Sequence, residues 1–162
     1  MTIEKIDSFE SGNPGTPAFK VHRYPFYLLN RLVSRYNIVI EARLREIRLD
    51  IPSWRVLMIL GERSPQGTRE IADAAVINLS TMTRIIQRIV VAGLVDATAS
   101  EEDARVTLVT LTSAGEDKLG EARRVAAPVY EHLVTGLNSG EFEMLIELLN
   151  RLHDNLGPLA RD

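Results

Sequence analysis

Cysteine is absent from the 162-residue sequence, and long apolar runs are missing as well. Without cysteine, the chain has no disulfide, no thiolate ligand for a metal and no cysteine nucleophile. No apolar run approaches the roughly 18 to 20 residues that cross a bilayer, and the first residues, MTIEKIDSFE, lack the basic start and apolar stretch of a signal peptide. We therefore expect a cytoplasmic protein that has no membrane partner.

The residue patterns of common catalytic and metal sites are also missing. The three histidines, His22, His132 and His153, are scattered, and the sequence contains no His-Glu-x-x-His motif and no glycine-rich phosphate loop before a helix. We predict no enzymatic activity, no cofactor and no metal site. One alternative, a metal site that combines these histidines with carboxylates across a dimer, stays open to a metal-binding assay.

Positive charge is not in excess. The net charge is -3, and the segment 52–112 holds seven acidic and six basic residues. Because phosphate neutralisation supplies much of the affinity for nucleic acid, this composition gives no general attraction to DNA. If the chain binds DNA, its affinity would depend on individually placed arginines and on the joint binding of two subunits in a dimer. The salt dependence of binding would then correspond to fewer than about ten phosphate contacts.

Helical periodicity dominates the sequence that is present. Residues 1–23 are rich in Gly, Pro, Ser and Thr and are predicted to form a flexible arm without secondary structure. Apolar residues recur at helical spacing over 24–50, and a second, buried helix follows Asp50 and Pro52 and ends at Gly61.

The middle of the chain combines two short helices with a hairpin. Thr68 is predicted to cap the helix REIADAA, and Asn78 to cap the helix LSTMTRIIQRIVVAG, which Gly93 ends. Two β-prone stretches, 95–98 and 105–112, flank the acidic loop ASEEDA and predict a hairpin. This order of elements is typical of a winged helix-turn-helix.

The last third is helical again. A helix is expected from Ser113 to about Leu137, bent at Pro128, and Asn138 with Glu141 predicts a capping box for the final helix. The apolar faces of the terminal helices exceed what a small lobe can cover, which favours a homodimer, with an intramolecular bundle as the alternative.

The predicted fold class is therefore mainly α with a small β-hairpin wing. A winged helix-turn-helix lobe at 51–112 is joined to N- and C-terminal dimerisation helices at 24–50 and 113–162. In a dimer, the second helix of each helix-turn-helix, the recognition helix, would bind one half-site of a palindrome, and the half-sites would lie about 34 Å apart.

The second helix of the predicted helix-turn-helix has a polar face suited to DNA. With its apolar residues turned inward, the outward residues are Ser80, Thr81, Arg84, Gln87 and Arg88. Arg and Gln can form bidentate hydrogen bonds with base edges, whereas Ser and Thr suit phosphates or either base. The alternative is the ordinary solvated face of an amphipathic helix.

The stretch GLVDATASEEDARVTLVTLTSAGE resembles the wing of the MarR family of bacterial regulators. The matching residues are Gly93, Leu94, Val95, Asp103, Arg105, Leu111, Thr112 and Gly115. The resemblance extends over about residues 24 to 156 and implies a ligand-responsive transcriptional regulator, most simply a repressor, that binds double-stranded DNA as a homodimer.

The resemblance also implies residue roles. Arg105 would enter the minor groove and Asp103 would hold it, although a surface salt bridge is the alternative for this pair. Ser80, Thr81 and Arg84 match recognition-helix positions, with Arg88 assigned to a phosphate. Where the family commonly carries a basic residue after Gly-Leu-Val, this chain has Asp96 and Ala97. This departure keeps open a protein-interaction module that has lost DNA binding.

Proteins that resemble this chain often bind a small aromatic or acidic effector between the dimerisation helices and the lobe. Aromatic and arginine side chains of the first two helices could form such a site. The candidates are Tyr24, Tyr27, Arg31, Trp54 and Arg55, with Phe26 and Tyr36 nearby in sequence. Core packing of the aromatics and solvated arginines are the alternative.

Overall fold

The computed structural model describes residues 9–157, in which helices and one small sheet confirm the predicted fold class. In chain order the elements are η1 (Glu10–Gly12), η2 (Val21–Arg23), α1 (Pro25–Glu46), α2 (Ile51–Glu62), β1 (Gln66–Gly67), α3 (Thr68–Ala75), α4 (Leu79–Val91), β2 (Val95–Ala99), β3 (Thr107–Leu111), α5 (Ser113–Leu133) and α6 (Ser139–Leu156). The chain divides into two compact units, with the boundary between Ala126 and Ala127 inside α5.

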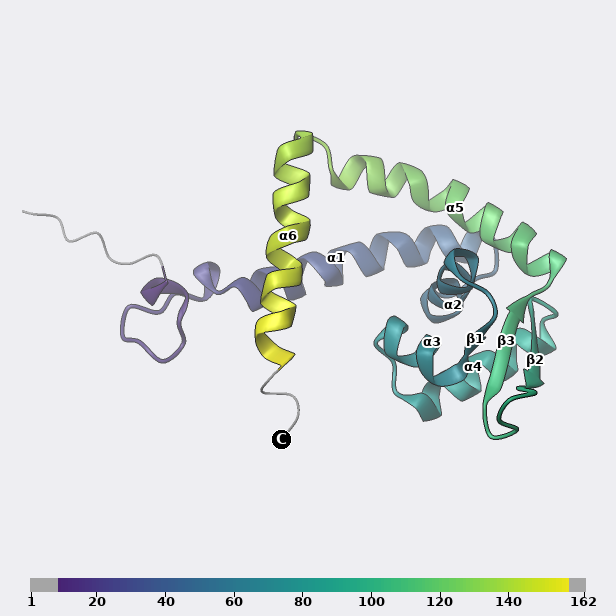
Figure 1. The fold of residues 1–162 in the computed structure, drawn as a ribbon. Coiled ribbons are helices and arrows are strands. Elements are labelled where there is room, and N and C mark those ends of the chain that lie inside the picture. The colour runs from purple at the N-terminus through teal and green to yellow at the C-terminus, as the bar shows by residue number, and fades with distance from the viewer. Residues whose placement is uncertain (1–8, 158–162) are drawn as a thin grey trace, which may run out of the picture. The chain divides into compact units, whose positions relative to one another are not determined.

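Helices α2, α3 and α4 and the sheet lie together as one lobe (Figure 1). Apolar side chains form its core. The side chains at its centre are all at most 2% exposed: Val56, Leu57, Leu60, Ile71, Met82 and Val109. Ile40 and Leu44 of α1 and Leu119 of α5 are buried as well. Helices α3 and α4 are bent by 110° relative to each other, the arrangement of a helix-turn-helix.

Side-chain caps begin two of the lobe's helices. The Oδ1 atom of Asn78 accepts the backbone N–H of Thr81 at 2.8 Å, which confirms the predicted cap of α4. Asp50 caps α2 in the same way, accepting the N–H of Ser53 at 2.8 Å. Each cap satisfies a backbone donor that the helix itself leaves unpaired.

The predicted Thr68 cap of α3 is wrong by one residue. Gly67 is the N-cap, and its backbone N–H donates to the Glu70 carboxylate at 2.9 Å. Thr68 is the first helical residue, and its hydroxyl donates to the carbonyl oxygen of Thr107 at 3.3 Å. The Thr107 carbonyl that accepts from Thr68 lies 39 positions away, beyond the reach of local capping patterns.

The sheet contains one strand more than predicted. Strands β2 and β3 form the expected antiparallel hairpin, with Val95 opposite Leu111 and Ala99 opposite Thr107. Strand β1 pairs with the other edge of β3. Its Gln66 is buried, and the amide Nε2 donates to two carbonyl groups near the end of α2, at 2.6 and 3.1 Å. A two-residue strand is too short to show a period of two, so periodicity could not reveal it.

The residues that open α5 pack directly on the start of the wing. A Cβ atom at Gly115 would overlap the carbonyl oxygen of Leu94, so only glycine fits there. The Thr112 hydroxyl donates to the carbonyl oxygen of Gly93 at 2.7 Å and accepts the N–H of Gly115 at 3.0 Å. Four residues of the wing motif therefore form a single junction.

The remaining elements refine the expected boundaries. Residues 1–8 of the predicted arm and 158–162 of the predicted C-terminal segment lie outside the described residues, and the described part of the arm contains η1 and η2. Helix α5 continues through Pro128 but ends at Leu133, and the bend at Pro128 stays a prediction. The capping box of α6 is confirmed, since Asn138 and Glu141 exchange hydrogen bonds of 2.9 and 3.0 Å.

The turn between α3 and α4 places Val76 in the left-handed region, with φ at +55° and the side chain 89% exposed. A β-branched residue is disfavoured there, and asparagine tolerates the conformation better. We expect Val76→Asn to raise the free energy of unfolding by about 1 kcal/mol, measured by denaturant titration. Val91→Asn is the matched control, because Val91 is also 89% exposed but lies in α4. Equal effects of the two substitutions would contradict the strain at Val76.

Candidate DNA interface

Burial of one side of α4 leaves the opposite side in solvent. Its buried side chains are Met82, Ile85, Ile86 and Ile89. The predicted contact residues Ser80, Thr81, Arg84 and Gln87 are all exposed. Thr83 is exposed as well, and its hydroxyl donates to the carbonyl oxygen of Leu79 at 2.9 Å. Sequence reasoning missed Thr83, although its helical spacing from Ser80 and Gln87 could have revealed it.

Arg88 has its own partners on another helix. Its Nη2 atom lies 2.6 Å from Oδ2 of Asp50 and donates to the Ser53 hydroxyl at 3.0 Å. Both partners belong to the start of α2, where Asp50 is the N-cap. The fifth residue of the predicted face is therefore joined to the rest of the lobe by its side chain.

The wing presents Arg105 to solvent, with its side chain 91% exposed. Asp103 accepts the Arg105 backbone N–H at 3.0 Å and its Nε at 3.1 Å. These two interactions hold the pKa of the Asp103 carboxyl below its ordinary value, so the carboxylate stays charged at neutral pH. Asp103 therefore shapes the loop that carries Arg105.

Recognition helix and wing border one open cleft of about 1000 Å³. Gln87 lines it from α4, Arg105 from the wing and Arg69 from α3. The two elements with the predicted contact residues thus face a common space.

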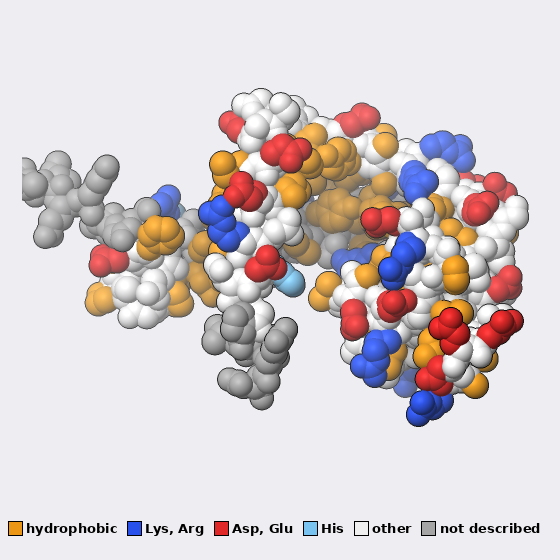
Figure 2. Space-filling model, viewed as in Figure 1, with side chains coloured by type: hydrophobic (Ala, Val, Ile, Leu, Met, Phe, Trp, Pro, Cys, Tyr) orange, Lys and Arg blue, Asp and Glu red, His pale blue; other side chains and the backbone are white. Residues whose placement is uncertain are grey.

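Acidic and basic side chains are interspersed over the lobe in the view of Figure 2, without a continuous basic face. Asp96 and Ala97 of β2 and the loop residues Glu101 and Glu102 are exposed, so the wing itself adds acidic charge. The lobe therefore offers individual arginines rather than a basic field.

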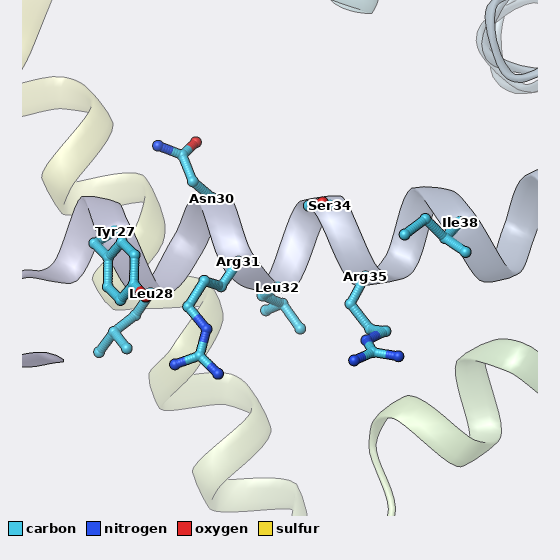
Figure 3. Close-up of a pocket in the computed structure, with 8 residues that line it drawn as sticks. All are labelled: Tyr27, Leu28, Asn30, Arg31, Leu32, Ser34, Arg35 and Ile38. Carbon is cyan, nitrogen blue, oxygen red and sulfur yellow. The ribbon is translucent and has the colours of Figure 1, made fainter.

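The predicted effector residues fall into separate places within one chain. Tyr24 packs edge-to-face with Phe19 and Phe26, at ring-centroid distances of 5.8 and 5.5 Å. Arg31 lies over the Tyr27 ring at 5.6 Å, and both line an open groove of about 750 Å³ on α1. Figure 3 shows Tyr27, Arg31 and Arg35 projecting to the same side of α1.

The other two predicted effector residues belong to α2. Trp54 is only 6% exposed, whereas Arg55 is partly exposed and lies near Tyr36 of α1. Burial raises the pKa of the Tyr36 phenol, and the positive charge of Arg55 partly offsets that rise. One chain therefore does not gather all five predicted residues.

Two polar atoms near this part of the protein are buried without a hydrogen-bond partner. They are the acceptor Oδ1 of Asn37 on α1 and the donor Nε1 of Trp54 on α2. Buried polar atoms are normally paired, because leaving one unpaired costs about 1–3 kcal/mol. A donor and an acceptor in the α1 and α2 region are thus available to a bound molecule or water.

Residues 9–157 contain no group of three or more histidine, aspartate or glutamate side chains that could hold a metal ion. No single helix in the same range combines the length and apolar character needed to span a membrane; α3 and α4 reach them only as a pair, across their 110° bend.

Comparison with known proteins agrees with this architecture. Residues 49–107 match the model of the MarR family. The HTH-type transcriptional repressor IacR of Pseudomonas putida is 35% identical over 147 residues, which cover 91% of this chain and 88% of that protein.

Solved structures share the fold. A MarR-family transcriptional regulator from Silicibacter pomeroyi has a TM-score of 0.77 at 23% identity, over 85% of this chain and 92% of that chain. BpsR of Bordetella bronchiseptica, whose DNA binding is regulated by 6-hydroxynicotinic acid, has a TM-score of 0.71 at 23% identity, over 79% of this chain and 97% of that chain. From the family match, the repressor relative and the helix-turn-helix with its wing, we conclude that the chain belongs to the MarR family of DNA-binding transcriptional regulators.

Proposed function

We propose that this protein is a repressor that binds a palindromic operator as a homodimer and releases it when a small aromatic acid binds. The observation that carries the proposal is the exposed polar side of α4 beside the exposed Arg105 of the wing. The repressor relative, 35% identical over nearly the whole chain, favours this function over an interaction module without DNA binding.

Contacts with the operator follow from side-chain chemistry. Arg84 and Gln87 would form bidentate hydrogen bonds with base edges in the major groove, because each offers two suitably spaced polar atoms. Ser80, Thr81 and Thr83 would hydrogen-bond phosphates or bases. Arg105 would exchange its Asp103 partner for the minor groove, where the negative potential is concentrated.

The expected result of removing these side chains differs between helix and wing. Arg84→Gln should reduce the preference for the operator over unrelated duplex by about tenfold or more, because a base contact contributes about 1–3 kcal/mol. Arg105→Gln should weaken binding mainly to operators with A·T-rich flanks. Fluorescence anisotropy with duplexes from the chain's own upstream region measures both effects.

Arg123→Gln, which alters an exposed arginine of α5, is the control for loss of one positive charge. A wild-type protein that binds none of these duplexes would support the interaction module instead. Operator binding unaffected by both Arg84→Gln and Arg105→Gln would contradict the assigned contacts.

Homodimerisation is supported by helices that lack a core of their own. Helix α6 has 18 residues and no buried side chain, although in proteins most of a helix's stability comes from the packing of its apolar face. Seven of its apolar side chains are 37 to 53% exposed: Met144, Leu145, Ile146, Leu148, Leu149, Leu152 and Leu156. Helix α1 also exposes apolar residues, among them Leu28, Leu32 and Val33. A second copy of the chain would cover these surfaces.

Leu145→Asp should therefore convert the protein from dimer to monomer, or shift the dissociation constant of the dimer by at least about tenfold, because it places a charge in the proposed apolar interface. Sedimentation velocity at several concentrations measures the change. Asn150→Asp adds the same charge at another exposed position of α6 and should leave the dimer intact. A wild-type protein of 18.1 kDa in solution would contradict the homodimer.

An aromatic acid fits the α1 and α2 region chemically. Arg55 supplies a cation for a carboxylate, and the unpaired Nε1 of Trp54 and Oδ1 of Asn37 supply a donor and an acceptor. Tyr24, Tyr27 and Arg31 lie toward the other end of α1 and would join such a site only from a second subunit.

A panel of benzoates and hydroxylated pyridine carboxylates should contain compounds that raise the melting temperature, because a ligand of the folded state stabilises it by mass action. The same compounds should lower operator affinity. Arg55→Gln and Trp54→Phe should abolish the thermal shift, whereas Arg123→Gln, the control for loss of one positive charge, should not. A panel without any hit, or hits that leave DNA binding unchanged, would contradict an aromatic-acid effector.

A further inference from the structure

Arg88 connects the recognition helix to the start of α2 through a carboxylate that already has a second role. The Oδ1 atom of Asp50 accepts the N–H of Ser53 and caps α2, while Oδ2 lies 2.6 Å from Arg88. The Ser53 hydroxyl, in a residue only 3% exposed, accepts a further hydrogen bond from Arg88. Arg88 therefore has two acceptors within the lobe.

The backbone conformation, burial and contacts of the corner between α1 and α2, which carries Asp50, hold it in place. Arg48 adopts the left-handed conformation, with φ at +57°, and Leu49 is buried beside it. The Nζ atom of Lys118 on α5 donates to the carbonyl oxygen of Ile47 at 3.3 Å. Basic side chains of α4 and α5 thus meet the same four-residue corner, Ile47 to Asp50, from different helices.

We propose that Arg88 is a positioning residue that fixes α4 against this corner, and that it makes no phosphate contact. The inference rests on the proposed function, because it concerns the orientation of the recognition helix on an operator. Both contacts use the Nη2 atom of Arg88, so a phosphate bound at that atom would have to displace Asp50 or Ser53. In this position, the Arg88 side chain fixes the angle of α4 relative to α2. The contact lies one helical turn beyond Arg84.

The same contact relates the proposed effector region to DNA binding. Ser53 directly precedes Trp54 and Arg55 in the first turn of α2. A ligand that displaces this turn would displace the Arg88 anchor and, with it, the angle of α4. In a dimer, that angle decides how far apart the two recognition helices stand.

The test uses the full-length protein with Asp50→Asn, Arg88→Gln and the double substitution. Asparagine caps helices as well as aspartate does, so Asp50→Asn removes the ion pair and keeps the cap of α2. Arg84→Gln is the comparison for loss of a proposed base contact one turn away on α4, and Arg123→Gln is the control for loss of one positive charge. Operator affinity is measured from low to high salt, and again with one base pair inserted between the half-sites.

We expect Asp50→Asn and Arg88→Gln each to lower operator affinity about three- to tenfold, and the double variant to lose no more than either single one. The slope of log affinity against log salt should match the wild type, whereas a lost phosphate contact would reduce it by about 0.9 per subunit. Both variants should also discriminate less between the two operator spacings, an effect that general destabilisation would not produce.

A reduced salt slope in Arg88→Gln, together with unchanged affinity in Asp50→Asn, would identify Arg88 as a phosphate contact. This result would overturn the positioning role and leave the proposed function intact. Additive losses in the double variant or unchanged spacing discrimination would overturn it as well. Failure of the wild type to bind any operator would overturn the proposed function and the positioning role with it.

Discussion

The packing of one side of α4 into the lobe is the constraint on which the DNA interface depends. Met82, Ile85, Ile86 and Ile89 are 6% exposed or less, so the helix cannot rotate about its axis without exposing large apolar side chains to water. Arg84 and Gln87 are held outward for this reason, not by contacts of their own. The Asn78 cap fixes where the helix begins, and the buried side fixes its orientation.

Because the lobe is nearly neutral, its affinity for DNA depends strongly on the orientation of α4. A strongly basic protein gains affinity from any approach to DNA, whereas the seven acidic and six basic residues of segment 52–112 nearly balance. Affinity must then come from side chains that meet the groove in the correct geometry. Rigid support of α4 is therefore more important in this protein than in a basic one, and an ion pair between α4 and α2 contributes to that support.

Local patterns in the sequence predicted most of the fold. Helical spacing, the Asn78 cap and the turn residue Gly93 identify α4 because each acts within a few positions along the chain. Contacts between distant residues were beyond such patterns. Thr68 bonds to Thr107, Gln66 pairs opposite Val109, and Arg88 turns to Asp50, so the Thr68 cap was misplaced, β1 was missed and the partners of Arg88 were not foreseen.

The glycine at the start of α5 has a mechanical consequence. At Gly115 the backbone of α5 touches the backbone of Leu94 directly, and Thr112 bridges the two segments through its hydroxyl. No side chain lies between them to absorb a displacement by changing rotamer. The first turn of α5 therefore sets the direction in which the hairpin leaves the lobe, and with it the position of Arg105 at the far end of the hairpin.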